Sequence, residues 1–280
     1  MECMYHYNPH GYYLFFYRLM KKLLIALLLL LPIPGMASKP ARIISLDLCT
    51  DWMLLKYAEQ SSVLALSPLV KRFPADWIKS DITSHDGSLE QILTLEPDLV
   101  LVGEFNASLL RQRLDKLGVN VVSLSLPKTL QQVHEYEQNF LEMLGESRDR
   151  ATTAFIKRNS EGVGPRLLLL GANGGGTGHD TLEHEMIELA GWQNYVTEPG
   201  YTRLELEKLV VDPPDAIMWS APASKALANN FMQHPALKHA IPAERWLETD
   251  YGNWQCQGPW TWEQVKQLQQ ARKQWYAPQH

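Results

Sequence analysis

One segment occurs twice in this chain. The first copy is Ser88-Leu-Glu-Gln-Ile-Leu-Thr-Leu-Glu-Pro-Asp-Leu-Val-Leu-Val102, and the second, 117 residues further on, is Glu205-Leu-Glu-Lys-Leu-Val-Val-Asp-Pro-Pro-Asp-Ala-Ile-Met-Trp219. The copies align without gaps and share a Leu-Glu pair near their start and a Pro-Asp pair further on. Each copy predicts a short helix, a Pro-Asp turn and a buried strand. The repeat therefore predicts two α/β lobes of similar construction, with chance similarity between two such units as the alternative.

Around the first copy, short apolar runs alternate with helical patterns. This alternation is typical of a doubly wound α/β unit with parallel strands. The predicted strands lie at residues 42–46, 63–66, 99–102 and 119–124, and predicted helices at 89–95 and 109–117. A further helix, capped by Thr50 and carrying Tyr57, is expected after the first strand.

A change of pattern at Thr129 marks the end of the first lobe. Apolar residues recur at helical spacing among Gln and Glu, which predicts a long helix, interrupted near Gly145 and resuming through Phe155. A second α/β set follows, with strands at 166–170, 216–219 and 246–248 and helices at 181–190 and 261–275. We therefore expect an N-terminal lobe (38–127), a single long bridging helix (128–160) and a C-terminal lobe (161–280), with a ligand cleft between the lobes.

The N-terminus has the pattern of a secretory signal. Lys21 and Lys22 precede nine apolar residues, 23–31, and Gly35-Met36-Ala37 places small residues where signal peptides are cut. As a helix, nine residues span about 14 Å, roughly half of a bilayer core. We predict that residues 1–37 are an upstream segment and a signal peptide cleaved after Ala37, with Met20 as an alternative start to Met1.

Composition and charge limit the classes of function that this protein can have. The 280 residues include 26 Lys plus Arg and 31 Asp plus Glu, a net charge of −5, so no broad basic surface for nucleic acid is expected. The hydrophobic share of 45% suits a packed core and is unlike that of a disordered chain.

Several segments resemble the substrate-binding proteins of ABC importers in the iron-siderophore, haem and cobalamin class. They are residues 42–51, 88–102, 181–194, 206–215 and 234–237, and Trp254-Gln-Cys-Gln-Gly-Pro-Trp-Thr261 is similar to a motif in one branch of that family. The resemblance implies two α/β lobes joined by one rigid helix, capture of a bulky ligand between them, and delivery to a permease of the inner membrane. We expect a monomer in the periplasm.

The resemblance also implies that one exposed glutamate per lobe docks on arginines of the permease. The matching positions are Glu90 and Glu207, at the start of each repeated helix. The alternative is that each carboxylate only complements the dipole of its helix.

Ligands of open α/β sheets lie beyond the carboxyl ends of the strands, so the loops at these ends are where we expect the ligand. Several of these loops carry aromatic side chains, which stack on flat macrocycles and aromatic chelators. The residues expected to line the cleft are Cys49, Ser67, Phe105, Asn173, Tyr201, Arg203, Tyr251, Trp254, Cys256 and Trp260. For Trp52, Trp192 and Trp219, which lie on helix or strand patterns, core packing is the favoured interpretation.

Three interpretations of Cys49 and Cys256 remain open: a disulfide between the lobes, a thiolate ligand to a metal or haem, and unpaired small residues of the cleft. His179 and His184 are interpreted as surface histidines, because no second spaced pair accompanies them. The glycine-rich segment 171–178 matches no nucleotide-binding pattern, so it predicts close backbone approach to a ligand.

These patterns predict a binding protein and not an enzyme. No nucleophile elbow or metalloprotease motif is present, and no catalytic residue, intrinsic cofactor or resident metal is expected. The expected ligand is a metal chelate: a ferric siderophore, a corrinoid or haem. The alternatives are an exported metal or haem carrier without a permease and a periplasmic hydrolytic enzyme.

Overall fold

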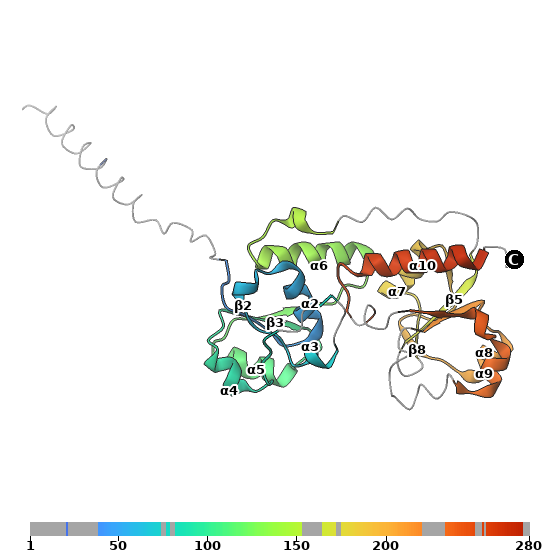
Figure 1. Ribbon diagram of the computed structural model, residues 1–280, viewed down its shortest axis with the longest axis horizontal. Coiled ribbons are helices and arrows are strands. Elements are labelled where there is room, and N and C mark those ends of the chain that lie inside the picture. The colour runs from blue at the N-terminus through green and yellow to red at the C-terminus, as the bar shows by residue number, and fades with distance from the viewer. Residues whose placement is uncertain are drawn as a thin grey trace, which may run out of the picture. The chain divides into compact units, whose positions relative to one another are not determined.

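The computed structural model describes residues 21, 39–73, 77–78, 82–152, 164–171, 175–219, 233–249, 254 and 256–276. By its internal contacts the chain divides into two units, Met1–Ser38 and Lys39–His280. Of the first unit only Lys21 is described, so the predicted signal peptide lies outside the described residues. The second unit contains two α/β lobes, each built on its own sheet (Figure 1).

The sheet of the N-terminal lobe has four parallel strands in the order β2-β1-β3-β4. They are β1 (Ile43–Ser45), β2 (Val63–Ala65), β3 (Leu99–Gly103) and β4 (Val121–Leu124). All four coincide with predicted runs to within two residues at each end, which confirms the parallel α/β interpretation of this half.

Helices cover both faces of this sheet, because alternate strand residues point to opposite sides. Residues such as Ile43 and Leu101 face α2 (Leu48–Tyr57) and α6 (Leu130–Met143). Residues such as Ile44 and Val100 face α4 (Leu89–Thr94) and α5 (Ser108–Lys116). A short helix, α3 (Leu69–Arg72), follows β2.

Helix α2 begins earlier than predicted. Its N-cap is Asp47, whose Oδ1 accepts hydrogen bonds from the backbone N–H groups of Cys49 (2.9 Å) and Thr50 (3.1 Å). The prediction of Thr50 as the cap is therefore wrong, and Thr50 lies inside the helix. An aspartate three residues earlier offers a charged acceptor to the same N–H groups, which is the stronger cap.

The C-terminal lobe has a six-stranded sheet in the order β10-β9-β5-β6-β8, with β7 paired to β5. The predicted strands appear as β5 (Arg166–Leu170), β9 (Ala216–Trp219) and β10 (Trp246–Glu248), all parallel. Three strands were not predicted: β6 (Gly175–Thr177), β7 (Gln193–Asn194) and β8 (Tyr201–Arg203). β6 pairs antiparallel with both β5 and β8, so this edge of the sheet departs from the parallel plan.

Two helices cover each face of the second sheet. Leu167 and Leu169 face α7 (Leu182–Leu189) and α10 (Thr261–Tyr276). Leu168 and Leu170 face α8 (Leu206–Val211) and α9 (Pro235–Ala240).

Helix α6 contributes to the cores of both lobes. Leu130 and Val133, in its first turn, pack with α7 and α10 of the C-terminal lobe, whereas Phe140 and Leu141 belong to the N-terminal core. Between these two ends the buried Glu137 accepts hydrogen bonds from the Tyr57 hydroxyl (2.6 Å) and the Thr152 N–H (2.8 Å). The helix thus bridges the lobes as expected, but it ends at Met143, and its predicted resumption through Phe155 lies outside the described residues.

The sequence repeat corresponds to a structural repeat. α4 and β3 form the first copy, and α8 and β9 the second. Asp98 accepts hydrogen bonds from the N–H of Arg42 (3.1 Å), and Asp215 accepts one from the N–H of Arg166 (2.7 Å). Each Pro-Asp turn therefore fastens the start of the central strand of its own lobe.

Candidate functional site

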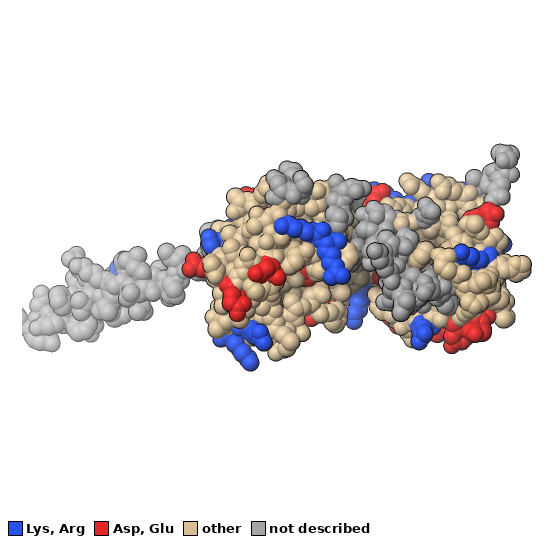
Figure 2. Space-filling model, turned by 60° about the horizontal axis from the view of Figure 1, so that its bottom comes forward, with Lys and Arg blue, Asp and Glu red and all other residues tan. Residues whose placement is uncertain are grey.

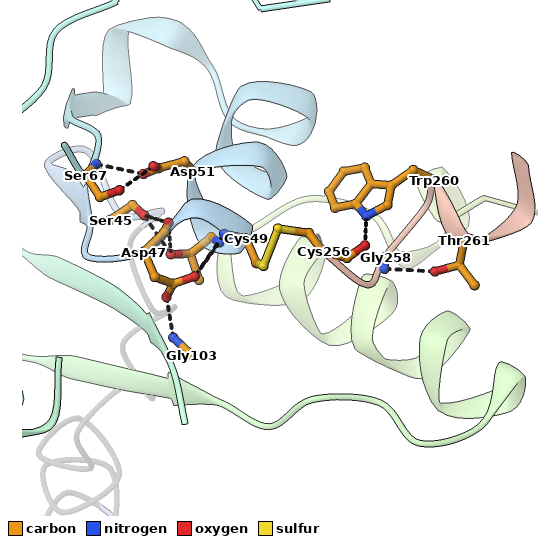
Figure 3. The surroundings of a disulfide bond; sticks show 11 residues. Ser45, Asp47, Cys49, Asp51, Ser67, Gly103, Cys256, Gly258, Trp260 and Thr261 are labelled. Atoms are coloured by element: carbon orange, nitrogen blue, oxygen red, sulfur yellow. Dashed lines mark hydrogen bonds between the residues drawn. A yellow bond between two sulfur atoms is a disulfide. The ribbon is translucent and has the colours of Figure 1, made fainter. Parts of the chain in front are cut away.

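The two cysteines form a disulfide between the first turn of α2 and the segment before α10 (Figure 3). Their Cα atoms are 5.2 Å apart, although 207 residues separate them in sequence. Cys256 is buried against Leu48 and Trp52 of α2. Of the three interpretations left open by the sequence, the disulfide is the one the structure has, and neither sulfur is a thiolate available to a metal or haem.

Tryptophan side chains surround this disulfide. Trp52 is buried and makes edge-on contacts with Trp260 (ring centroids 5.2 Å apart) and Trp77 (5.6 Å). Trp260, predicted to face the ligand, is half-buried, and its indole N–H donates to the carbonyl of Cys256. Trp52 and Trp192 are core residues, as predicted.

Next to the disulfide lies a cluster of buried polar groups at the carboxyl ends of β1, β2 and β3, which we call the strand-end cluster: Ser45, Asp47, Asp51, Ser67 and His85. Asp47 Oδ2 accepts the N–H of Gly103 at 2.5 Å. Asp51 accepts both the N–H (2.8 Å) and the hydroxyl (2.6 Å) of Ser67. Sequence reasoning missed Asp51. Its position one turn after Asp47, on an apolar helix, was a signal that two carboxyl groups would be buried close together.

Ser67 was predicted to contact the ligand. The structure buries it completely, and its hydroxyl is used by Asp51 and by the N–H of Leu69 (3.2 Å). Its position at the end of β2 is as expected, but its side chain points into the strand-end cluster.

Phe105 lies just beyond the end of β3 and is 77% exposed. It lines a pocket of 640 Å³ between the end of the sheet and α6, together with Leu126 and Tyr136. Burial raises the pKa of the Tyr136 hydroxyl far above its ordinary value. The pocket therefore combines a mixed lining, which includes Glu104 and Lys128, with a neutral phenol.

Tyr201 and Arg203 were expected in a loop, but both belong to the antiparallel strand β8. Tyr201 is 72% exposed, and its hydroxyl donates to Glu183 at 3.4 Å. Partial burial, followed by the charge of Glu183, raises the pKa of Tyr201 to about 12. Arg203 lines a second pocket, of 760 Å³, whose wall includes Glu207.

Glu90 and Glu207 occupy equivalent places. Each lies in the first turn of its repeated helix and is exposed, and neither carboxylate has a hydrogen bond or ion pair within the described residues. Both carboxylates are therefore free for an outside partner.

The remaining predicted residues are placed as follows. Trp254 is half-buried, and its indole N–H donates to Thr249 Oγ1 (2.6 Å). Asn173 and Tyr251 lie outside the described residues. The rings of His179 and His184 are in contact at a tilt of 58°, with centroids 4.6 Å apart, but among the described residues no three His, Cys, Asp or Glu side chains form a group able to hold a metal ion.

Acidic and basic side chains are interspersed on the face shown in Figure 2, and neither sign covers a whole lobe there. Within the described part of the chain, no helix is long and apolar enough to cross a membrane.

Comparison with known proteins gives a clear result only at the level of structure. No family model matches the chain, and no curated protein matches its sequence. The periplasmic heme-binding protein of Pseudomonas aeruginosa superimposes with a TM-score of 0.65 at 19% identity, covering 83% of this chain and 92% of that one.

Two further solved structures agree. An ABC transporter substrate-binding protein of Listeria monocytogenes has a TM-score of 0.62 at 16% identity, covering 84% of this chain and 100% of that one. The periplasmic vitamin B12-binding protein BtuF of Vibrio cholerae has a TM-score of 0.60 at 18% identity, covering 84% and 97%. The chain therefore has the two-lobe fold of the periplasmic substrate-binding proteins of ABC importers.

Proposed function

We propose that this protein captures a metal chelate in the periplasm and delivers it to an ABC permease of the inner membrane. The observation that carries the proposal is the presence, on this two-lobe fold, of a large exposed aromatic side chain in each lobe, Phe105 and Tyr201. Exposed aromatic rings are able to stack on flat ligands. A ferric siderophore, a corrinoid or haem fits such a surface, and similarity to proteins that bind heme and vitamin B12 supports the same class.

The ligand contacts we propose are Phe105, Tyr201, Arg203 and Trp254, together with Asn173 and Tyr251. Cys49, Ser67, Cys256 and Trp260 have a different part, because their sulfur atoms, hydroxyl and ring are engaged in the disulfide and the groups around it. They shape the wall beneath the ligand by holding α2 and α3 in place.

The ligand surface is proposed to be largely preformed. Helix α6 packs in the cores of both lobes. The disulfide in addition joins α2 covalently to the segment before α10. Two such ties restrict closure of the lobes, so affinity comes mainly from an ordered surface and little from a large conformational change.

Delivery is proposed to use Glu90 and Glu207. Two free carboxylates at equivalent places on one rigid body make paired charge-assisted contacts with arginines, which set docking orientation more than affinity.

The experiment is a titration of intrinsic tryptophan fluorescence with protein recovered from the periplasm. Cobalamin, haem and a panel of ferric siderophores are added separately, with absorbance controls for inner-filter quenching. Saturable quenching by one compound at micromolar or tighter affinity supports the proposal and identifies the ligand. No response to any of them contradicts the proposed ligand class.

A further inference from the structure

The strand-end cluster contains two buried carboxylates without a counter-ion. Asp51 is 0% exposed and Asp47 is 2% exposed. No ion pair of the described residues involves either of them. An ionised carboxylate buried without a cation is costly, and such a group usually takes up a proton instead.

The charged and titratable groups around Asp51 come from three elements. Asp47, at the start of α2, adds a like charge. His85, from the segment before α4, donates its Nε2–H to the Ser45 carbonyl (2.8 Å) while its Nδ1 accepts the N–H of Gly87 (2.9 Å). Burial lowers the pKa of His85, so this ring is neutral at neutral pH. α3 carries Lys71 and Arg72, both exposed and neither in an ion pair.

The hydrogen bonds of Ser67 depend on whether Asp51 is ionised or protonated. When Asp51 is ionised, Ser67 donates both its N–H and its hydroxyl to the carboxylate. When Asp51 is protonated, the carboxylic acid has a proton of its own to donate, and the hydroxyl of Ser67 becomes the acceptor. Because Ser67 Oγ also accepts the N–H of Leu69, this change reaches the first turn of α3 directly.

Burial dominates over the hydrogen bonds from Ser45 and Ser67, which lower the pKa, and raises the pKa of Asp51 to about 7. Opening of α3 gives the carboxyl access to water, where its pKa returns to about 4. Ionisation therefore favours the open position, and protonation favours the closed one.

We propose that Asp51 is a proton-binding site that controls α3: protonation of Asp51 stabilises the closed position of the segment Ser67–Arg72, and ionisation raises the fraction of molecules in which this segment is locally open. The proposal does not depend on the identity of the ligand. It makes the end of β2 sensitive to pH.

The test is amide hydrogen exchange of the native, ligand-free protein, followed by NMR from pH 5 to pH 8 and corrected for the intrinsic pH dependence of exchange. The N–H groups of Ser67, Val70 and Phe73 are hydrogen-bonded within the closed segment. Their protection factors are expected to fall about tenfold between pH 6 and pH 8 and to level off above pH 7.

Two variants separate Asp51 from its neighbours. Asp51→Asn keeps an acceptor for the Ser67 N–H and donates to Ser67 Oγ, so it imitates the protonated state and is expected to abolish the pH dependence. His85→Gln removes the buried imidazole next to Ser45 and is expected to leave the dependence unchanged. Protection that is independent of pH in the unmodified protein, or pH dependence that survives Asp51→Asn or is lost in His85→Gln, overturns the proposal.

Infrared spectroscopy of the unmodified protein gives a second test that needs no variant. The carbonyl band of a buried, protonated carboxylic acid is expected at pH 6 and is expected to disappear by pH 8. Absence of this band at pH 6 overturns the proposal even if Asp51→Asn does not fold.

Discussion

Removal of the disulfide tests the link between α2 and the segment before α10. The change is the double substitution Cys49→Ser with Cys256→Ser, compared with the unmodified protein under oxidising and reducing conditions. The bond closes a loop of 207 residues. The chain-entropy relation for such a loop gives about 5 kcal/mol of stabilisation, an upper value because unfolded chains retain some compactness.

The assay is urea unfolding followed by circular dichroism. With a slope of about 3 kcal/mol per M for a chain of this size, the unfolding midpoint is expected to fall by up to about 2 M in the variant. Reduction of the unmodified protein is expected to lower its midpoint by the same amount, whereas the variant should not respond to reductant. The agreement between these two shifts separates loss of the bond from damage caused by the substitutions.

Two results would refute the reasoning. One is a thiol titration that finds Cys49 and Cys256 free in the native, oxidised protein. The other is an unfolding midpoint that does not move when the bond is reduced, which would mean that the bond does not stabilise the fold by restricting the unfolded chain.

Three further predictions follow from the site. Charge reversal at both docking positions, Glu90→Lys with Glu207→Lys, is expected to abolish uptake in cells while the fluorescence titration of the purified variant stays unchanged; weakened ligand binding would count against the docking role. Phe105→Ala and Tyr201→Ala are each expected to weaken ligand binding about tenfold, with the exposed Leu117→Ala as a control that changes nothing, and equal affinity in all three variants would remove the aromatic contacts from the proposal. Because the pKa of Asp51 is raised in the folded protein to about 7 from 3.8, the contribution of Asp51 to folding stability is present in full below about pH 4 and is lost, by up to about 4 kcal/mol, as the pH rises to 7; the unmodified protein should therefore lose more stability over this range than Asp51→Asn does, as measured by urea unfolding, and equal changes in the two proteins would contradict the assignment.

The parallel strands could be predicted from sequence because each is a short apolar run between a turn and a helix. The repeated helix and strand carried this information twice, and the structure adds the reason for the Pro-Asp pair: Asp98 and Asp215 hold the strands that begin at Arg42 and Arg166. The strands β6 and β8 could not be predicted. Each has only three residues, and β6 is rich in glycine, so neither has the apolar run that marks a strand in the sequence.

The site was predicted less completely than the fold, for a physical reason. A small polar residue at a strand end, such as Ser67, has the same local pattern whether it faces a ligand or the interior. The Ser67 side chain points inward because its hydroxyl donates a hydrogen bond to Asp51, 16 residues earlier in the sequence. The disulfide was likewise one of three interpretations, because no spacing rule connects cysteines 207 residues apart.

The position of α6 between two cores has a consequence for the order of folding. A chain that crosses a membrane from its N-terminus releases the N-terminal lobe and α6 before α7 and α10 have emerged. Phe140 and Leu141 find their partners at once, but Leu130 and Val133 stay exposed until Met186 and Val265 arrive. Under the export proposed above, the partly exported protein carries an apolar strip at one end of α6, a type of surface that chaperones bind. Burial of the first turn of α6 needs residues of the C-terminal lobe, so we expect the two lobes to become protease-resistant together.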